Sequence, residues 1–340
     1  MTGRMRFAIA GVDHWYTAMP LAQSLAGSPD AELVVVADGA IERAREVADL
    51  GGGQATTDLE AALADDSVEV VVTCVDAARN PGFCVRAAQA GKHLLSMKPM
   101  AMTLADANRV VAAVESAGIV FVAAESRTRI TPLGRLLREL VAARRLGPVV
   151  SGTLSLAGNL PASWPGSDDP GWWVDPLRTP GGGWIDHAIY HIDRMRWMLD
   201  ADVASVSGRV ARLAHPGLPV EDHGHAVVEF TDGSVVAIED GWAAAPGAAR
   251  ISLALAGGEG SIAFDSLSGQ LSHFGATGWT HGEIPDDDPS DLAPLIAHFR
   301  DPVIGLGGVR DAWDNLAACL AFYESARTGT TVTPARGFWA

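Results

Sequence analysis

The stretch Arg6-Phe-Ala-Ile-Ala-Gly11 is an apolar run that ends in glycine and continues as Val-Asp13-His14-Trp15-Tyr16. It predicts a buried strand that turns into a helix over about residues 16–26. The same alternation predicts strands at 32–37, 69–74, 93–96 and 119–123, and helices at 40–50, 81–90 and 104–117. Near-continuous apolar strands separated by helices are typical of α/β proteins with a doubly wound parallel sheet.

The alternation of predicted strands and helices ends after Gly147-Pro148. Period-two runs predict strands at 203–212, 223–231, 234–242, 250–255, 261–264 and 270–273, with Asp232-Gly233 as a hairpin turn. Helices are expected at 183–199, 292–300 and 309–327. We therefore predict two domains. Residues 1–125 form the doubly wound domain, and residues 126–340 form an α+β domain with a mostly antiparallel sheet, whose last helix packs back toward the first domain.

The length, net charge and cysteine content of the chain exclude several classes of protein. A chain of 340 residues favours two domains, and its net charge of −16 argues against nucleic-acid binding. Its three cysteines are too few and too scattered for a disulfide framework. The apolar run Phe7–Val12 is too short for a signal peptide, and no stretch is long enough to cross a membrane. A cytoplasmic protein is expected.

The turn after the first strand is the candidate cofactor site. A dinucleotide fingerprint has three glycines at this point, and here only Gly11 is present, so His14 and backbone amides are expected to supply donors. The next strand ends in Asp38, which suits the adenosine ribose hydroxyls and repels a 2′-phosphate. This favours NAD, although Arg43 and Arg45 leave NADP open. The predicted contacts at this turn are Gly11, Asp13, His14, Trp15 and Asp38.

A second cluster follows Gly181-Gly-Gly183, in the helix containing Asp186-His-Ala-Ile-Tyr-His-Ile-Asp193. Residues four apart lie one turn above each other, so Asp186 and Tyr190 share one face. His187 and His191 share a neighbouring face. Acid and base groups this close behind a glycine run are typical of a catalytic site.

Several motifs in order give the chain a family resemblance. They are Ala90-Gly-Lys-His before Lys98-Pro99, Arg129-Ile-Thr-Pro132, Gly147-Pro-Val, Gly171-Trp-Trp-Val-Asp-Pro176, the segment from Gly181 to Trp197, Val220-Glu-Asp222 and Tyr323-Glu-Ser-Ala-Arg-Thr-Gly329. Together they resemble the Gfo/Idh/MocA family over almost the whole length. The resemblance implies a Rossmann domain, a C-terminal domain with a large open sheet, NAD(P), and homodimers or homotetramers formed through that sheet. It also implies sugar, cyclitol or polyol substrates.

Matched to the family motifs, Lys98 is kept, whereas Met97 replaces the usual glutamate. Asp186 and Asp193 are kept, and Tyr190 takes the place of the usual catalytic histidine. The loop Thr73–Asn80 carries Asn80 where a histidine is common. The resemblance therefore adds Thr73, Asp76, Asn80, Met97 and Lys98 to the predicted cofactor contacts.

These residues predict the oxidation of a secondary alcohol. Lys98 would bind the reacting oxygen, and Asp186 would hold the substrate or orient the acid/base group. Tyr190 is the first choice for proton transfer, because a neighbouring ammonium should lower its pKa from about 10. His191 is the competitor, although it points ~100° away along the helix. Asp193 is expected to be structural, paired with Arg196 or a backbone amide.

The predicted substrate contacts are Trp172, Trp173, His187 and Arg127. An alternative is a zinc site built from the i, i+4 pair His187 and His191 with His223 and His225. The metal-free interpretation is preferred, because hydrogen-bonded histidines explain the same pattern.

Two other functions stay open beside the dehydrogenase. One is an enzyme that uses bound NAD transiently for oxidation and elimination on a sugar. The other is a non-catalytic dinucleotide-binding regulator.

Overall fold

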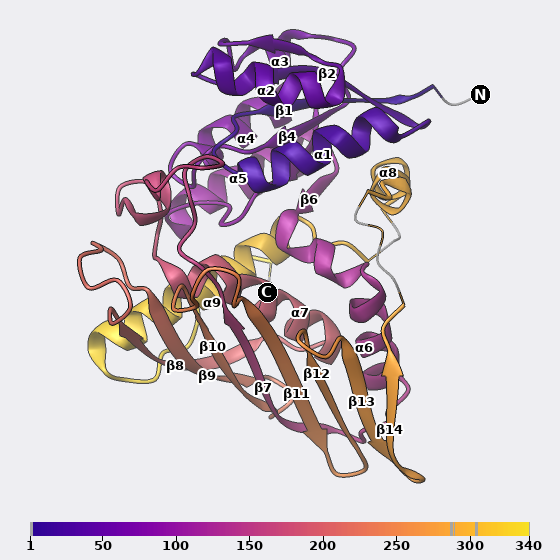
Figure 1. Ribbon diagram of the computed structural model, residues 1–340, viewed down its shortest axis with the longest axis vertical. Helices are drawn as coiled ribbons and strands as arrows, with labels where there is room; N and C mark the ends of the chain where they lie inside the picture. Colours follow the sequence, from indigo (N-terminus) through magenta and orange to yellow (C-terminus); the bar gives the residue numbers. More distant parts are fainter. Residues whose placement is uncertain (1–2, 286–287, 289, 303–304, 340) are drawn as a thin grey trace.

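The computed structural model describes residues 3–285, 288, 290–302 and 305–339. Two β-sheets lie one beyond the other along the long axis of the molecule (Figure 1). The first contains six parallel strands in the order β3-β2-β1-β4-β5-β6. This order confirms the predicted doubly wound sheet. The strands are β1 (Met5–Ala10), β2 (Ala31–Ala37), β3 (Gln54–Thr56), β4 (Val70–Thr73), β5 (His93–Ser96) and β6 (Phe121–Ala123).

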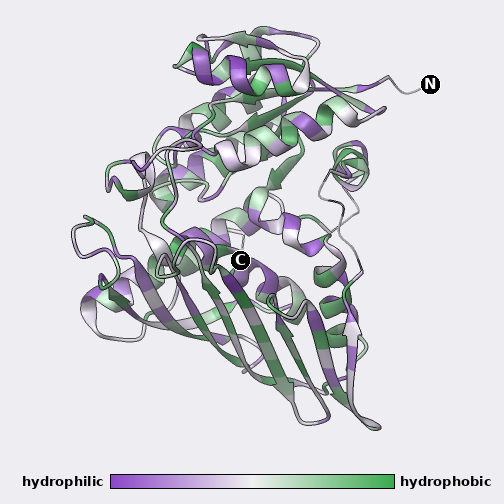
Figure 2. Ribbon diagram, in the orientation of Figure 1, coloured by the Kyte–Doolittle hydropathy of each residue, from purple (hydrophilic) through white to green (hydrophobic). Residues whose placement is uncertain are grey.

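The second sheet has eight strands in the order β14-β13-β12-β11-β7-β10-β9-β8. All neighbours are antiparallel except β7 and β10, which confirms the predicted mostly antiparallel sheet. Figure 2 shows apolar and polar bands alternating along these strands, as expected for a sheet with one buried face. The strands are β7 (Val149–Ala157), β8 (Val203–Ala211), β9 (His223–Phe230), β10 (Val235–Gly241), β11 (Arg250–Gly257), β12 (Ser261–Asp265), β13 (Gln270–Gly275) and β14 (Gly278–Glu283).

Alternate side chains of β1 face two separate cores, so the first sheet is covered on both faces. Phe7 and Ile9 pack with Leu21 and other residues of α1 on one side. Ala8 and Ala10 face the other side, where Phe83 of α4 is buried. The helices are α1 (Trp15–Gly27), α2 (Ile41–Gly51), α3 (Ala61–Ala64), α4 (Asn80–Gln89) and α5 (Leu104–Ala117).

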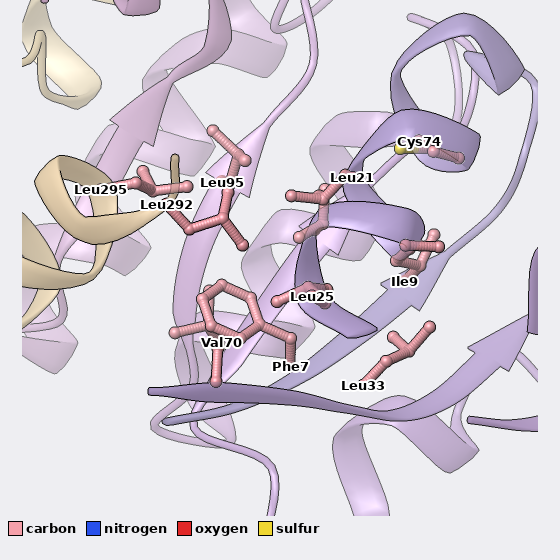
Figure 3. Packing of buried hydrophobic residues seen from close by; sticks show 14 of the residues in the cluster. Phe7, Ile9, Leu21, Leu25, Leu33, Val70, Cys74, Leu95, Leu292 and Leu295 are labelled. Carbon is pink, nitrogen blue, oxygen red and sulfur yellow. The ribbon is translucent and has the colours of Figure 1, made fainter. Parts of the chain in front are cut away.

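A segment from the far end of the chain closes the first of these cores. Leu292 and Leu295, at the start of α8 (Ala293–Arg300), face the cluster around Leu95 (Figure 3). Phe299 meets Phe7 edge to face, with ring centroids 6.2 Å apart. The first core therefore takes residues from beyond the proposed 125/126 boundary.

Three helices cover one face of the second sheet: α6 (Pro132–Ala142), α7 (Gly183–Leu199) and α9 (Val309–Thr328). Trp184 of α7 stacks on Phe322 of α9, with centroids 3.6 Å apart. Helix α9 also contacts α5 and β6 of the first sheet, so it bridges both parts of the molecule. Within the described residues, no helix is both long and apolar enough to span a membrane.

Two α-helices and three strands of the described residues lie outside the sequence prediction: α3, α6, β3, β7 and β14. The most important is β7, the central strand between β10 and β11. Its Ser151-Gly-Thr153 run is small and polar, so it lacks the continuous apolar signal of the first-domain strands. Tertiary pairing on both sides makes it a strand despite this weak local preference.

Candidate active site

The turn after β1 has the backbone features of a phosphate-binding turn. Gly11 has φ +75°, and a Cβ there would lie 2.4 Å from Cγ1 of Val75, so only glycine fits. Among the described residues, the amides of Trp15 and Tyr16 at the start of α1 donate to no other group. Free amides at a helix N-terminus bind phosphate groups, so the turn fits a dinucleotide despite its single glycine.

Asp38 lies beside this turn, just after β2. Its two carboxylate oxygens accept the amides of Val12 and Ala40, each at 2.9 Å. The carboxylate is buried, so its position is fixed by the turn it faces.

Asp13 and Asp76 are held in an ion-pair network. The carboxylate of Asp13 accepts the amide of Asp76 at 3.0 Å and pairs with Arg79. Asp76 accepts Nε of Arg79 at 2.8 Å and a terminal nitrogen of Arg178 at 2.7 Å. Burial alone would raise the pKa of Asp76, but these arginines lower it below its usual value. Arg178 comes from the loop before α7, and no local sequence signal pointed to it.

The other predicted cofactor contacts after β4 and β5 are buried. Asn80 donates to the hydroxyl of Ser96 and to the carbonyl of Met100, both at 2.9 Å. It braces the loop after β5 and is almost fully buried, so the structure does not expose the Asn80 amide as a cofactor contact. Thr73 is fully buried, whereas Met97 is buried but lines a cavity of about 440 Å³ together with Arg127.

An aromatic cluster covers the cofactor turn. The rings of Trp172 and Trp173 stack at 4.1 Å, and Trp172 lies 4.8 Å from His14. The indole of Trp172 donates to the carbonyl of Asp13, and that of Trp15 donates to the carbonyl of Ala162. The loop between β7 and α7 therefore lies against the turn.

His14 is enclosed by this cluster. Its Nδ1 lies 2.8 Å from the hydroxyl of Tyr16. Burial, with a contribution from the Lys98 ammonium, lowers the pKa of His14 to about 3. The ring is therefore neutral at pH 7 and takes part in hydrogen bonding rather than carrying charge.

Lys98 and Asp186 form the centre of the site. Nζ of Lys98 donates to the backbone carbonyl of Asp186 at 2.6 Å and also to its carboxylate. The other carboxylate oxygen accepts the indole N–H of Trp242 at 2.9 Å. Burial alone would lower the pKa of Lys98, but the adjacent carboxylate raises it above its usual value. The pair is therefore a fixed ammonium and carboxylate.

Tyr190 lies next to this pair, but not as the sequence suggested. The Lys98 ammonium is 5.4 Å from the centre of the Tyr190 ring. Burial raises the pKa of Tyr190, and this effect outweighs the lowering by Lys98. The expected lowering of the Tyr190 pKa is therefore wrong, because the hydroxyl is desolvated as well as close to a cation.

The two helix histidines have different surroundings. His187 lines a cavity of about 620 Å³ together with Lys98, Asp186 and Tyr190. Its Nε2 is 3.5 Å from Oδ2 of Asp186. His191 is not among the residues that line this cavity. Its Nε2 lies 3.4 Å from Oδ1 of the buried Asp240 on β10.

The cavity is lined by three groups of residues. The first group comes from the first domain, the second from the loop before α7 and from α7 itself, and the third from β7, the loop after it and the β11–β12 region. They are Tyr16, Lys98, Leu156, Gly158, Asn159, Leu160, Pro161, Trp173, Asp186, His187, Tyr190, Ala249, Arg250, Ile251 and Ser266. Of the predicted substrate contacts, Trp173 and His187 are in this set. Trp172 and Arg127 are not.

Asp193 is structural, as expected, but its partner differs. Its carboxylate accepts hydrogen bonds from Nε of Arg129 at 2.8 Å and from a terminal nitrogen of the same side chain at 2.5 Å. Arg196 pairs instead with Asp202 and Asp314. Asp193 and Arg196 are three positions apart on α7, a spacing that suggested a pair, but helical spacing could not reveal the distant Arg129.

The proposed zinc ligands do not form one cluster. His223 lies 3.5 Å from Glu239, and His191 faces Asp240. In the described part of the chain, no three histidine, cysteine or acidic side chains gather with the geometry of a metal site.

Glu125 is a buried carboxyl group that the sequence reasoning missed. It lies in the short helix Ala124–Arg129, where Nδ2 of Asn315 donates to it at 3.3 Å. Burial, together with the nearby Asp193 charge, raises its pKa to about 7. Glu125 lines neither of the two cavities described above.

A doubly wound parallel sheet with a phosphate-binding turn, beside a buried lysine–aspartate pair, defines a dinucleotide-dependent oxidoreductase. Residues 5–124 match the model of the oxidoreductase family with an NAD-binding Rossmann fold. Residues 135–263 match that of the GFO/IDH/MocA C-terminal domain. The chain therefore belongs to the Gfo/Idh/MocA family.

Its relatives act on sugars and inositols. 1,5-Anhydro-D-fructose reductase of Ensifer adhaerens is 27% identical over 82% of this chain and 84% of its own length. scyllo-Inositol 2-dehydrogenase (NAD(+)) of Bacillus subtilis is 26% identical over 98% of this chain and 97% of its own. GenD2 from gentamicin A biosynthesis, crystallised with NAD, superposes with a TM-score of 0.82 at 25% identity, covering 99% and 98% of the two chains. The chain is an NAD-binding oxidoreductase of the sugar and inositol dehydrogenase type.

Proposed function

We propose that this protein transfers hydride between a nicotinamide cofactor and a secondary alcohol or ketone of a sugar, cyclitol or related polyol. The observation that carries this proposal is the buried Lys98–Asp186 pair, which lines a cavity beside the dinucleotide turn. When bound, the cofactor supplies the hydride acceptor or donor. The protein supplies orientation and charge.

Lys98 is the group that binds the reacting oxygen in this proposal. Two of its N–H groups are taken by the carbonyl and the carboxylate of Asp186, which leaves one for the substrate. A fixed ammonium stabilises negative charge on an alkoxide as the hydroxyl proton leaves. Asp186 holds that ammonium in place, and Trp242 holds Asp186.

The cavity suits a neutral polyol. Trp173 and Tyr16 present aromatic surface for the C–H faces of a ring, and Asn159 and Ser266 provide polar contacts. Arg250, near its rim, is already paired with Asp265. The printed names of the relatives, which are reductases and dehydrogenases of sugars and inositols, favour the same substrate class.

The test is a screen of polyols and keto-sugars with NAD⁺ and NADH, following absorbance of the reduced nicotinamide. The expected result is turnover with at least one sugar or cyclitol, with reduced cofactor formed in proportion to the alcohol consumed. Substrate loss without free NADH would instead support oxidation and elimination with retained cofactor. Cofactor binding without any turnover would support a regulator.

NAD is the proposed cofactor in preference to NADP, because the Asp38 carboxylate is fixed beside the turn. Asp38→Asn keeps the shape and removes the charge that repels a 2′-phosphate. We expect NADPH to bind the variant roughly tenfold more tightly, about 1.4 kcal/mol, measured by fluorescence titration. Asp49→Asn on the exposed side of α2 is the control and should not change the NADH/NADPH ratio. An unchanged ratio of NADH to NADPH affinity in Asp38→Asn would show that Asp38 does not discriminate against the 2′-phosphate.

A homo-oligomer formed through the second sheet completes the proposal. The face of that sheet away from α7 exposes apolar side chains, which are Val227, Val235, Phe274 and Trp279. Phe274 and Trp279 contact each other, with ring centroids 5.4 Å apart. Clustered exposed aromatic residues are typical of protein–protein interfaces.

A further inference from the structure

We propose that His187 is the proton-transfer group of this site, accepting the substrate hydroxyl proton during alcohol oxidation. The inference rests on the proposed function and deepens it. It places the acid/base group next to Asp186 in the sequence, rather than at Tyr190. Each of the other candidate groups is held in a way that limits proton transfer.

Lys98 is held as an ammonium. It is buried, it donates twice to Asp186, and that carboxylate keeps it protonated. An ammonium can bind an alkoxide, but it cannot accept the hydroxyl proton. Lys98 is therefore the oxygen-binding group and not the base.

Tyr190 and Glu125 are both less suited than His187. The Lys98 ammonium lies over the Tyr190 ring, 5.4 Å from its centre, and burial makes the phenol harder to ionise by raising its pKa. Glu125 does not line the substrate cavity, so it has no direct path to a bound hydroxyl. His14 is enclosed by tryptophans and already bonded to Tyr16.

His187 is more accessible than the Lys98–Asp186 pair beside it. Its side chain is 23% exposed, against 3% for Lys98 and 9% for Asp186. Its ring packs against Gly158, where a Cβ would lie 3.0 Å from Cε1 of the imidazole, so the glycine leaves space for the ring. Nδ1 has no partner among the described residues, and Nε2 faces the Asp186 carboxylate.

The surroundings of His187 favour a base that can hold a proton briefly. Burial lowers its pKa below 6.5, and Lys98 and His191 lower it further, so the imidazole is neutral at pH 7. Asp186 and Asp240 act in the opposite direction and stabilise the imidazolium once it forms. The other ionisable groups around it are Tyr190 on the same helix and Tyr16 and Arg250 across the cavity.

The substrate hydroxyl gives its proton to an imidazole nitrogen of His187, while the hydrogen on the same carbon leaves as hydride to oxidised nicotinamide. The C–O bond becomes a carbonyl. The imidazolium then returns its proton to water through the exposed edge of the ring. In the direction of reduction His187 gives the proton back.

The experiment compares His187→Gln, Tyr190→Phe and the control His223→Gln with the unchanged protein. His223 lies on β9 outside the cavity. In the unchanged protein, kcat/KM for oxidation should rise with pH through a group whose pKa lies below 6.5, because only neutral imidazole accepts the proton. His187→Gln should lower kcat by roughly 100-fold and abolish this low-pH limb. Tyr190→Phe and His223→Gln should keep the limb.

Three further measurements separate the role of His187 in proton transfer from a role in folding. NADH affinity, followed by fluorescence, should be the same in His187→Gln and the unchanged protein. If the glutamine variant does not bind NADH, His187→Ala replaces it, and added imidazole should restore activity to that variant only. The His187 resonance, assigned by its loss in the variant, should titrate below 6.5 in NMR spectra.

The outcomes distinguish this inference from the function on which it rests. If the unchanged protein turns over no polyol, the proposed function fails and this inference fails with it. If it is active and the low-pH limb survives in His187→Gln but disappears in Tyr190→Phe, the function stands and His187 is overturned in favour of Tyr190.

Discussion

Lys98→Met is expected to lower kcat by a factor of about 10²–10³ while NADH still binds. The substitution keeps an unbranched side chain of similar length and removes the charge. It removes the donor that would stabilise the alkoxide, and it leaves the Asp186 carboxylate with Trp242 as its remaining side-chain donor. Steady-state kinetics on the best polyol substrate, with NADH titration beside it, measures the effect.

Lys92→Met is a matched control for this experiment. Lys92 is also buried, and its Nζ donates to the carbonyls of Asp65 and Val68, at 2.8 and 2.9 Å. It lies away from the cavity, so its loss should affect stability more than turnover. Retention of more than a tenth of kcat in Lys98→Met would show that oxygen binding does not depend on Lys98.

Arg129→Met is expected to destabilise the fold by about 3–5 kcal/mol, because it leaves a buried carboxylate without its cation. Arg129 binds both oxygens of Asp193 and also reaches Asp311 at 3.0 Å. It therefore joins the short helix after β6 to α7 and α9. The midpoint of urea unfolding, monitored by tryptophan fluorescence, should fall accordingly.

A surface arginine provides the comparison. Arg109 pairs with Asp106 on the exposed side of α5, and Arg109→Met should cost less than about 1 kcal/mol. Arg129→Met with Asp193→Asn should recover part of the loss, because the unpaired charge is then removed as well. Equal effects of Arg129→Met and Arg109→Met would contradict the assignment of a buried, stabilising pair.

The sequence was most informative where local patterns decide the structure. The apolar runs Phe7–Ala10 and Val70–Thr73 are buried on both faces, and such runs are recognisable without knowing their neighbours. Strand β7 was missed because its place between β10 and β11 depends on pairing that no local pattern encodes. The contribution of α8 to the first core has the same origin, since its partners lie at the other end of the chain.

The residues of the site also fall into those that local motifs indicate and those that only tertiary structure brings in. Lys98 and Asp186 belong to short motifs, so the sequence could indicate both, and the structure brings them into contact. Arg178 reaches the site from the loop before α7, and Asp240 and Trp242 reach it from the end of β10, so no local spacing connects them with it. The different surroundings of His187 and His191 also required three dimensions, because helical periodicity places them on one face without saying what each meets.

The closure of the first core by α8 bears on how the protein is made. β1 leaves the ribosome well before Leu292, Leu295 and Phe299. Until they emerge, the nascent first sheet carries an uncovered apolar face around Phe7 and Leu95. Domains that fold during synthesis usually do so as soon as they are complete. This one is not complete until α8 has been translated, so its exposed face is a natural target for chaperones during that interval.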